Sequence, residues 1–146
     1  MPYKILIVDD EPDLLESVSF LLEDAGYEVA CATNGHEAIG ATHTFQPDLV
    51  LLDVMMPKEN GYRVSRKLHE AQSFGLLPDH MKVVLVTARK LDHDPEREKM
   101  FENYARPHGV VYKPFDPEQL LSTIRGLVEP DTRPVPLPID EVAEPG

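Results

Sequence analysis

Short runs of apolar residues alternate along the chain with segments in which apolar residues recur every three or four positions. The runs are too short for helices and end at polar or turn-forming residues, which is typical of strands buried on both faces of a sheet. The recurring pattern instead predicts amphipathic helices that pack against those strands. The predicted strands are residues 4–8, 27–32, 49–52, 82–86 and 109–112.

A predicted helix follows each strand. Pro12 can begin the first helix because the missing N–H of a proline costs nothing there, and Gly26 ends that helix. The fourth helix, from Pro95, is polar and only weakly amphipathic. Helix signals cover residues 12–25, 38–45, 64–71, a stretch from 95, and 117–128. This alternation predicts an α/β fold, a doubly wound five-stranded parallel sheet with helices on both faces.

The composition changes after the last predicted helix. A chain of 146 residues has room for one domain with its own core, and we expect that domain to span residues 1–128. Residues 129–146 mix prolines with acids and isolated apolar residues. This composition predicts a Pro-rich acidic tail or linker that is disordered.

Composition also narrows the function classes. The formal net charge of -12 repels nucleic-acid phosphates, so direct nucleic-acid binding by this chain is not expected. No apolar run approaches the ~18 residues of a membrane span, and the N-terminus lacks a signal-peptide pattern. We therefore expect a cytoplasmic protein with no membrane partner. Cys31 is the single cysteine, and we expect it to be a small buried residue.

Polar side chains end four of the five predicted strands. The C-terminal ends of parallel strands meet at one edge of the sheet, where ligands bind in open α/β folds. Taken alone, each residue has an ordinary structural explanation as a helix cap, a turn residue or a surface lysine. Their combination at one edge favours a functional site. The residues are Asp9 and Asp10 after the first strand, Asp53 after the third, Thr87 after the fourth and Lys113 after the fifth.

The chemistry of this combination is phosphoryl transfer. Two carboxylates about 4 Å apart repel each other by about 4 kcal/mol at an effective dielectric near 20, so the acids need cations beside them. Lys113 supplies one positive charge, and Mg²⁺, which prefers oxygen ligands, is the natural second. In such a site a carboxylate can attack phosphorus and form an aspartyl-phosphate, while cations and a hydroxyl neutralise the phosphoryl oxygens.

Four motifs, in order along the chain, resemble those of the response-regulator receiver domain of two-component signalling, of the chemotaxis-regulator kind. The resemblance covers about residues 4 to 128. It implies a flavodoxin-like strand order of 2-1-3-4-5 and a cis peptide bond between Lys113 and Pro114. The motifs are Val8-Asp9-Asp10-Glu11, Leu52-Asp53-Val54-Met55-Met56-Pro57 with Gly61, Val86-Thr87-Ala88 and Tyr112-Lys113-Pro114-Phe115.

The resemblance also implies a role for each residue of the group. Asp53 is the phosphoacceptor, Thr87 is the switch hydroxyl, and Lys113 pairs with the phosphoryl group. Such a domain is a signalling switch and not an enzyme, because it assists only its own phosphorylation and dephosphorylation. The implied Mg²⁺ ligands are Asp9, Asp10, Asp53 and the backbone carbonyl of Met55.

Two kinds of partner follow from the same resemblance. The implied phosphodonor is a sensor histidine kinase or a histidine phosphotransfer protein. The signal then passes to a downstream protein or an output domain, through the surface formed by the fourth helix, fifth strand and fifth helix. Homodimer formation on phosphorylation is a further option.

Two departures from the family pattern concern the switch. Val110 stands where the family usually has an aromatic residue, three positions before the lysine. Tyr112 follows on the same side of the predicted strand and can take part of that role. The connections that contain residues 73–80 and 94–108 are longer than typical, which bears on the surface around the fourth helix.

Two other functions remain open at this point. A phosphatase that works through an aspartyl-phosphate would carry a second acid two residues after the nucleophile, where this chain has Met55. A receiver-shaped interaction module that is not controlled by phosphorylation is compatible with Val110. The sequence also leaves open whether the chain is a stand-alone regulator, a phosphorelay intermediate or a portion of a longer protein.

Overall fold

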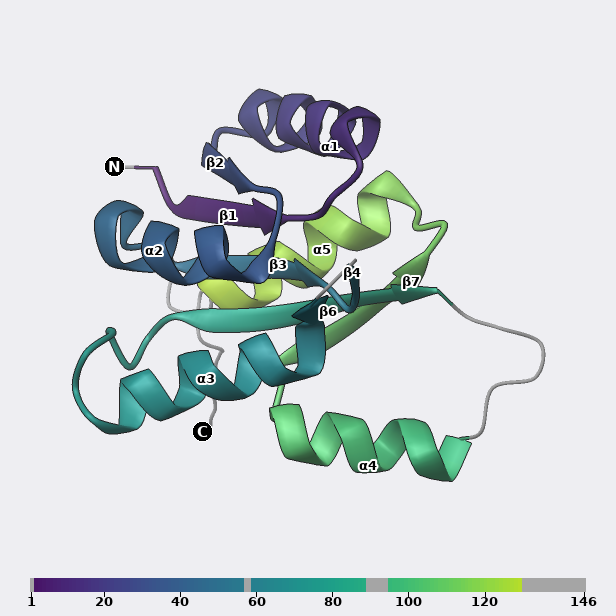
Figure 1. Cartoon of the computed structure of the whole chain (residues 1–146). Coiled ribbons are helices and arrows are strands. Elements are labelled where there is room, and N and C mark those ends of the chain that lie inside the picture. Colours follow the sequence, from purple (N-terminus) through teal and green to yellow (C-terminus); the bar gives the residue numbers. More distant parts are fainter. Residues whose placement is uncertain (1, 57–58, 89–94, 130–146) are drawn as a thin grey trace, which may run out of the picture.

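The computed structural model describes residues 2–56, 59–88 and 95–129. Five strands form one parallel sheet in the order β2-β1-β3-β6-β7 (Figure 1). They are β1 (Lys4–Val8), β2 (Glu28–Ala32), β3 (Leu49–Asp53), β6 (Lys82–Ala88) and β7 (Gly109–Lys113). The helices are α1 (Pro12–Asp24), α2 (Gly35–Phe45), α3 (Gly61–Ser73), α4 (Pro95–Ala105) and α5 (Pro117–Val128). The doubly wound α/β fold and the strand order predicted for the five sheet strands are thus confirmed.

Helices cover both faces of the sheet (Figure 1). Leu22 of α1 and Ile124 of α5 pack with Ile7 and Val84 on one face. Leu68 of α3 packs with neighbouring strand residues on the other face. Because β3 has a hydrogen-bonded strand on each side and helices on both faces, all of its residues are buried. A continuous apolar run is the sequence that such a strand requires.

A small hairpin follows β3. Strand β4 (Met55–Met56) pairs antiparallel with β5 (Glu59–Asn60). Asn60 is the N-cap of α3, because its side-chain oxygen accepts a hydrogen bond from the backbone N–H of Tyr62 at 2.9 Å. The motifs alone did not predict these two short strands.

The expectation that Cys31 is buried was wrong. Cys31 is exposed, and its Sγ lies 3.2 Å from the Ser19 Oγ of α1. The physical reason is the place of β2 at the edge of the sheet, where neighbouring elements cover a strand only in part. The Lys113–Pro114 bond is cis, as the resemblance implied.

Helix α4 lies alongside α3 at the margin of the fold (Figure 1). The Tyr62 ring of α3 stacks on Phe101 of α4, with 5.0 Å between ring centroids. The Arg66 guanidinium lies over the Tyr104 ring at 4.9 Å. Ala105 is the buried residue of α4, which agrees with the polar pattern predicted for this helix.

The predicted tail or linker lies outside the described residues, apart from Glu129. Its disorder therefore stays a prediction. Within the described part of the chain, the helices are all too short or too polar to cross a membrane.

Gly61 sets the distance between α3 and the end of β3, which gives a first testable prediction. A Cβ at this position would lie 2.5 Å from the backbone oxygen of Asp53 and 2.6 Å from the Val54 Cα. We expect Gly61→Ala to lower the free energy of unfolding by about 2 kcal/mol, since overpacking forces the backbone to shift. Urea denaturation measures this effect.

Gly40 of α2 provides the matched control, because a Cβ there meets no atom within 4 Å. Gly40→Ala should raise the free energy of unfolding by about 0.5 to 1 kcal/mol, as alanine favours the helix. Equal effects from the two substitutions would contradict the close approach at Gly61.

Candidate functional site

Asp9 follows β1 directly and is 2% exposed. Its N–H donates to the Ala32 carbonyl at 3.1 Å, which continues the β1–β2 pairing by one residue. Its Oδ1 accepts the backbone N–H of Glu11 at 2.9 Å, and its Oδ2 accepts Lys113 Nζ at 3.2 Å. Asp9 therefore stabilises the start of α1 and also takes part in the polar cluster. Its interpretation as a helix-capping residue and its interpretation as a site residue are thus compatible.

Asp53 ends β3 and is 3% exposed. Its Oδ1 accepts the backbone N–H of Met55 at 3.2 Å. The next residue, Val54, donates its N–H to the Val86 carbonyl of β6 at 2.9 Å. These backbone contacts hold the carboxyl group at the C-terminal edge of the sheet.

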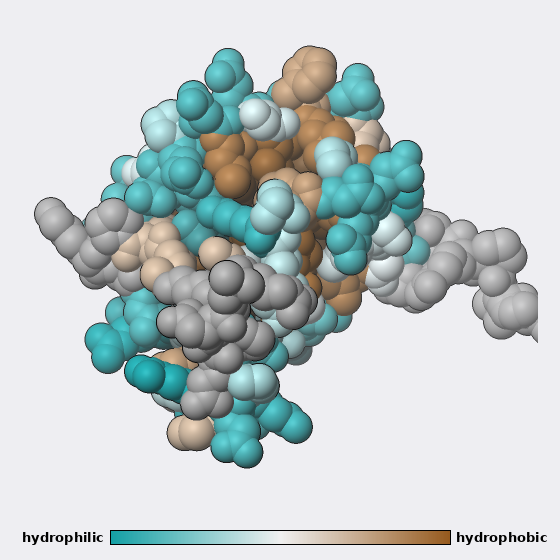
Figure 2. Space-filling view, turned by 90° about the vertical axis from the view of Figure 1, so that its right-hand side faces the viewer, coloured by the Kyte–Doolittle hydropathy of each residue, from teal (hydrophilic) through white to brown (hydrophobic). Residues whose placement is uncertain are grey.

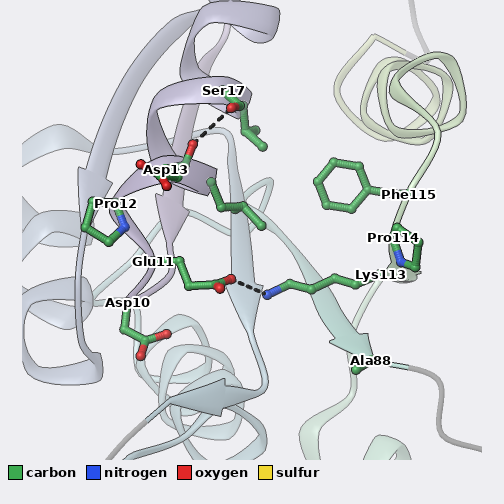
Figure 3. A pocket seen from close by; sticks show the side chains of 11 residues that line it. Asp10, Glu11, Pro12, Asp13, Ser17, Ala88, Lys113, Pro114 and Phe115 are labelled. Carbon is green, nitrogen blue, oxygen red and sulfur yellow. Dashed lines mark hydrogen bonds and ion pairs between the residues drawn. The ribbon is translucent and has the colours of Figure 1, made fainter.

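Lys113 ends β7 and connects the acids. Its Nζ lies 3.2 Å from Asp9 Oδ2, 3.5 Å from Glu11 Oε1 and 3.6 Å from Asp53 Oδ1. Figure 3 shows the Glu11 contact, in which the two side chains approach each other from α1 and β7. We did not predict that Glu11 reaches the lysine, although its place directly after the two aspartates was a usable signal.

Thr87 is 7% exposed and lies near the end of β6. Asp53 pairs with Val86 in the β3–β6 register, so Thr87 is one position further along the neighbouring strand. Thr87 in turn pairs with Tyr112 of β7, whereas Val110 pairs with Leu85. The residues predicted from strand ends thus gather at one edge, and Tyr112 is the aromatic residue beside the threonine.

The acid cluster has the donor set of a hard-cation site. One oxygen from each of Asp9, Asp10 and Asp53 lies within 4.8 Å of the others. Asp9 and Asp53 are buried, whereas Asp10 is exposed. Carboxylate oxygens open to water on one side suit Mg²⁺, which keeps several water ligands. The residues therefore fit the predicted metal, and among the described residues no other such group of acids, histidines and cysteine occurs.

Without a metal ion, the surroundings of Asp53 disfavour the ionised form of its carboxyl group. Burial and the nearby Asp9 raise its pKa to about 6, and Lys113 and the Met55 N–H oppose that rise only in part. Burial lowers the pKa of Lys113, but Asp53, Asp9 and Glu11 together outweigh burial and raise it. The lysine is therefore charged at neutral pH, and the cluster favours a further cation.

An open cavity adjoins Lys113 (Figure 3). It lies between the N-terminal part of α1 and the connection from β7 to α5, and Leu14, Val18 and Phe115 form part of its wall. Figure 2 views the molecule from this side, and apolar side chains gather there among polar ones. The edge of the sheet thus combines a charged cluster with an apolar hollow.

The chain belongs to the response regulator receiver domain family, whose model matches residues 5–125. Receiver domains are switches in two-component signalling, and they take phosphoryl groups from histidine kinases and relay the signal to output partners. The resemblance identified from the motifs is confirmed.

Individual relatives agree with this assignment. The response regulator Rre1 of Synechocystis is 38% identical over 129 residues, which cover 87% of this chain and 52% of Rre1. The protein PilH of Pseudomonas aeruginosa is 32% identical over 86% of this chain and 97% of PilH. The crystal structure of chemotaxis protein CheY4 of Vibrio cholerae is similar with a TM-score of 0.74 and 30% identity, over 87% of this chain and 99% of that one. The chain spans about half the length of several curated relatives, Rre1 among them.

The raised pKa of Asp53 predicts a stabilising substitution. An ordinary aspartate has a pKa of 3.8, so the unfolded chain loses this proton before the folded chain does, and stability falls as the pH rises from about 4 to about 6. Without Mg²⁺, Asp53→Asn should raise the free energy of unfolding at pH 7 by about 2 kcal/mol. The gain should vanish near pH 4, where the native carboxyl group is already neutral.

Thermal unfolding with and without Mg²⁺ checks this expectation. Mg²⁺ should raise the thermal stability of the unsubstituted protein by more than that of the Asp53→Asn variant, because only the unsubstituted protein keeps all three carboxylates. Asp13→Asn, an exposed substitution at the start of α1, is the control and should change neither response. A destabilised Asp53→Asn at pH 7 in the absence of metal would refute the electrostatic account.

Proposed function

We propose that this chain is a phosphoacceptor receiver that takes a phosphoryl group onto Asp53 with the help of Mg²⁺. The donor is a sensor histidine kinase or a histidine phosphotransfer protein, and the response is a change in the surface formed by α4, β7 and α5. The observation that carries this proposal is the position of a buried Asp53 carboxyl group 3.6 Å from the Lys113 ammonium, within a cluster of acids that fits a hard cation.

The proposed reaction begins with attack of an Asp53 carboxylate oxygen on the phosphorus atom of a phosphohistidine. An O–P bond forms as the P–N bond breaks, and the leaving imidazole takes up a proton from solvent water. The Met55 N–H holds Oδ1 of Asp53 in place during the attack, while Lys113 pairs with a phosphoryl oxygen. Mg²⁺, held by Asp9, Asp10, Asp53 and the Met55 carbonyl, would supply charge neutralisation for the same oxygens.

The surroundings of the cluster support access by a protein donor. The cavity beside Lys113 opens between α1 and the β7–α5 connection, and its wall is largely apolar. An apolar wall around a charged centre favours a protein surface that can exclude water from the reaction. The donor histidine would come from the partner.

The proposed switch begins at Thr87. Phosphorylation replaces a carboxylate by a group of nearly two negative charges, and the Thr87 hydroxyl on the neighbouring strand is the nearest switch candidate by register. Because Tyr112 pairs with Thr87 in the sheet, movement of the hydroxyl would reach Tyr112 directly. Val110, two residues earlier, is partly buried and packs against a core cluster. We infer that Tyr112 takes over the coupling usually given to an aromatic residue at the Val110 position.

The alternatives are less favoured. A phosphatase of external substrates lacks its second acid, because Met55 occupies that place and is exposed. An interaction module without phosphorylation control would not need the contacts that gather Asp9, Asp53 and Lys113. Both arguments support the switch.

We propose that the signal passes from the receiver fold to a separate downstream protein or an output domain. Residues 1–128 would form the receiver domain, and residues 129–146 a tail or linker. A downstream protein or an output domain would read the α4–β7–α5 surface, and homodimer formation on phosphorylation is one way to present it.

The test of this function is covalent phosphorylation in solution. The full chain, incubated with Mg²⁺ and acetyl phosphate or phosphoramidate, should gain one phosphoryl group by intact mass. Asp53→Asn and metal-free samples should gain none, and Lys113→Ala should react more slowly. Asp13→Asn, on the wall of the same cavity, is the matched control and should react normally. Failure of the unsubstituted protein to react, with Mg²⁺ binding shown independently, would remove the phosphoacceptor role.

The role of Tyr112 yields a separate prediction. Tyr112→Leu should still form the phosphoryl adduct but should lose the change in hydrogen exchange that phosphorylation causes in residues 95–113. Val110→Leu should keep that change, since Val110 pairs with Leu85 and not with Thr87. An unaltered response in Tyr112→Leu would show that the coupling takes another route.

A further inference from the structure

Two histidines face each other at the opposite end of the fold from the acid cluster. His69 lies on α3 and His108 directly precedes β7. Their ring centroids are 5.3 Å apart, with 36° between the ring planes. Neither residue belongs to the motifs of the phosphoryl site, so their arrangement needs an explanation of its own.

His108 makes two hydrogen bonds to Val83 of β6. Its backbone N–H donates to the Val83 carbonyl at 2.7 Å, and its Nδ1 accepts the Val83 N–H at 3.0 Å. The second bond requires a neutral ring with its proton on Nε2, because an imidazolium has no lone pair to accept an N–H. Protonation of Nδ1 would therefore break the bond and leave the Val83 N–H without its partner.

His69 is equally unsuited to a second proton. Its Nε2 is buried and has no hydrogen-bond partner. A charge on this half-buried ring would lie beside the His108 ring, and holding a charge partly away from water is costly. The surroundings of the pair therefore favour the neutral form of both rings.

The charged groups that face the pair are cationic. Arg66 comes from α3, Arg106 from the connection after α4, and Lys82 from β6. Glu70, an acid on α3, pairs instead with Arg66 at 3.4 Å. Burial lowers the pKa of His69 first, and Arg106 and Arg66 lower it further, while contacts with the Arg106 backbone and Gln72 oppose this in part. His108 is exposed as a residue, but partial burial of its ring lowers its pKa as well, followed by Lys82 and His69, while a contact with the Val83 backbone opposes this in part.

The C-terminal end of α4 is attached to the rest of the fold beside this pair. The carbonyl of Ala105, the last residue of α4, accepts a hydrogen bond from the Ser65 hydroxyl of α3 at 2.9 Å. Arg106 then turns the chain with a φ of 54°, and two residues later His108 joins β6. Since Ala105 is the buried residue of α4, this connection is a main attachment of a helix that is otherwise largely exposed.

We propose that the His69–His108 pair is an acid-sensitive clasp that fastens the C-terminal end of α4 to α3 and β6 while both rings are neutral and loosens it when a ring is protonated. The stabilisation is complete above the ordinary histidine pKa of 6.5 and declines as the pH falls from that value towards the lowered pKa of the folded state. The clasp acts without phosphorylation. That it modulates the output surface is a consequence that rests on the proposed function, because α4 belongs to that surface.

Nuclear magnetic resonance of the full chain between pH 7.5 and 5.5 tests the clasp. As His108 titrates, the Val83 amide proton should shift towards the position of a non-bonded amide with the same midpoint. Protection factors for residues 101–108, corrected for intrinsic exchange, should fall at least about threefold over this range. A Val83 amide that stays fixed while His108 titrates would overturn the proposal.

Substitutions separate the clasp from a general effect of acid. In His108→Asn the side-chain oxygen can replace Nδ1 as acceptor but does not titrate, so protection should become independent of pH. His69→Phe keeps a ring beside His108 and removes its like charge, so it should raise the His108 titration midpoint. His43→Asn, an exposed control on α2, should respond like the unsubstituted protein. If His108→Asn loses protection on acidification as the unsubstituted protein does, the clasp is wrong.

Discussion

The attraction between one lysine and several carboxylates governs the C-terminal edge of this sheet. Lys113 reaches Asp9, Glu11 and Asp53 within 3.6 Å, yet a single ammonium cannot balance the charges gathered there. Burial and this imbalance together raise the pKa of Asp53 to about 6. The same imbalance makes a divalent cation favourable, so a feature that costs stability in the bare protein is also the basis of the proposed chemistry.

The parallel sheet is what converts separated motifs into this cluster. Parallel strands place all their C-terminal ends at one edge, and therefore residues as distant as Asp9 and Lys113 could be assigned to one site from the sequence. The apolar run of β3 predicted its burial, since a strand covered on both faces tolerates few polar residues. Strand order and the cis Lys113–Pro114 bond came from the resemblance, because no local pattern determines either.

What the sequence did not predict depends on contacts between elements. Cys31 looked like a core residue, but its exposure follows from the position of β2 at the sheet edge. Glu11 reaches Lys113 only because the start of α1 lies beside the end of β7. His69 and His108 lie 39 positions apart and carry no motif spacing, so only the packing of α3 against the connection after α4 brings their rings together.

The weak attachment of α4 links these observations. The helix presents few apolar residues. Phe101 in the helix stacks on Tyr62, and at the C-terminal end Ala105 and His108 form hydrogen bonds with α3 and β6. Elements with little buried surface open at low free-energy cost. A small change in charge near either attachment can therefore move α4 without disturbing the core beneath β3. In the proposed switch, the coupling from Thr87 through Tyr112 would have to displace only this lightly held helix, which would suit a receiver that has Val110 in place of an aromatic residue.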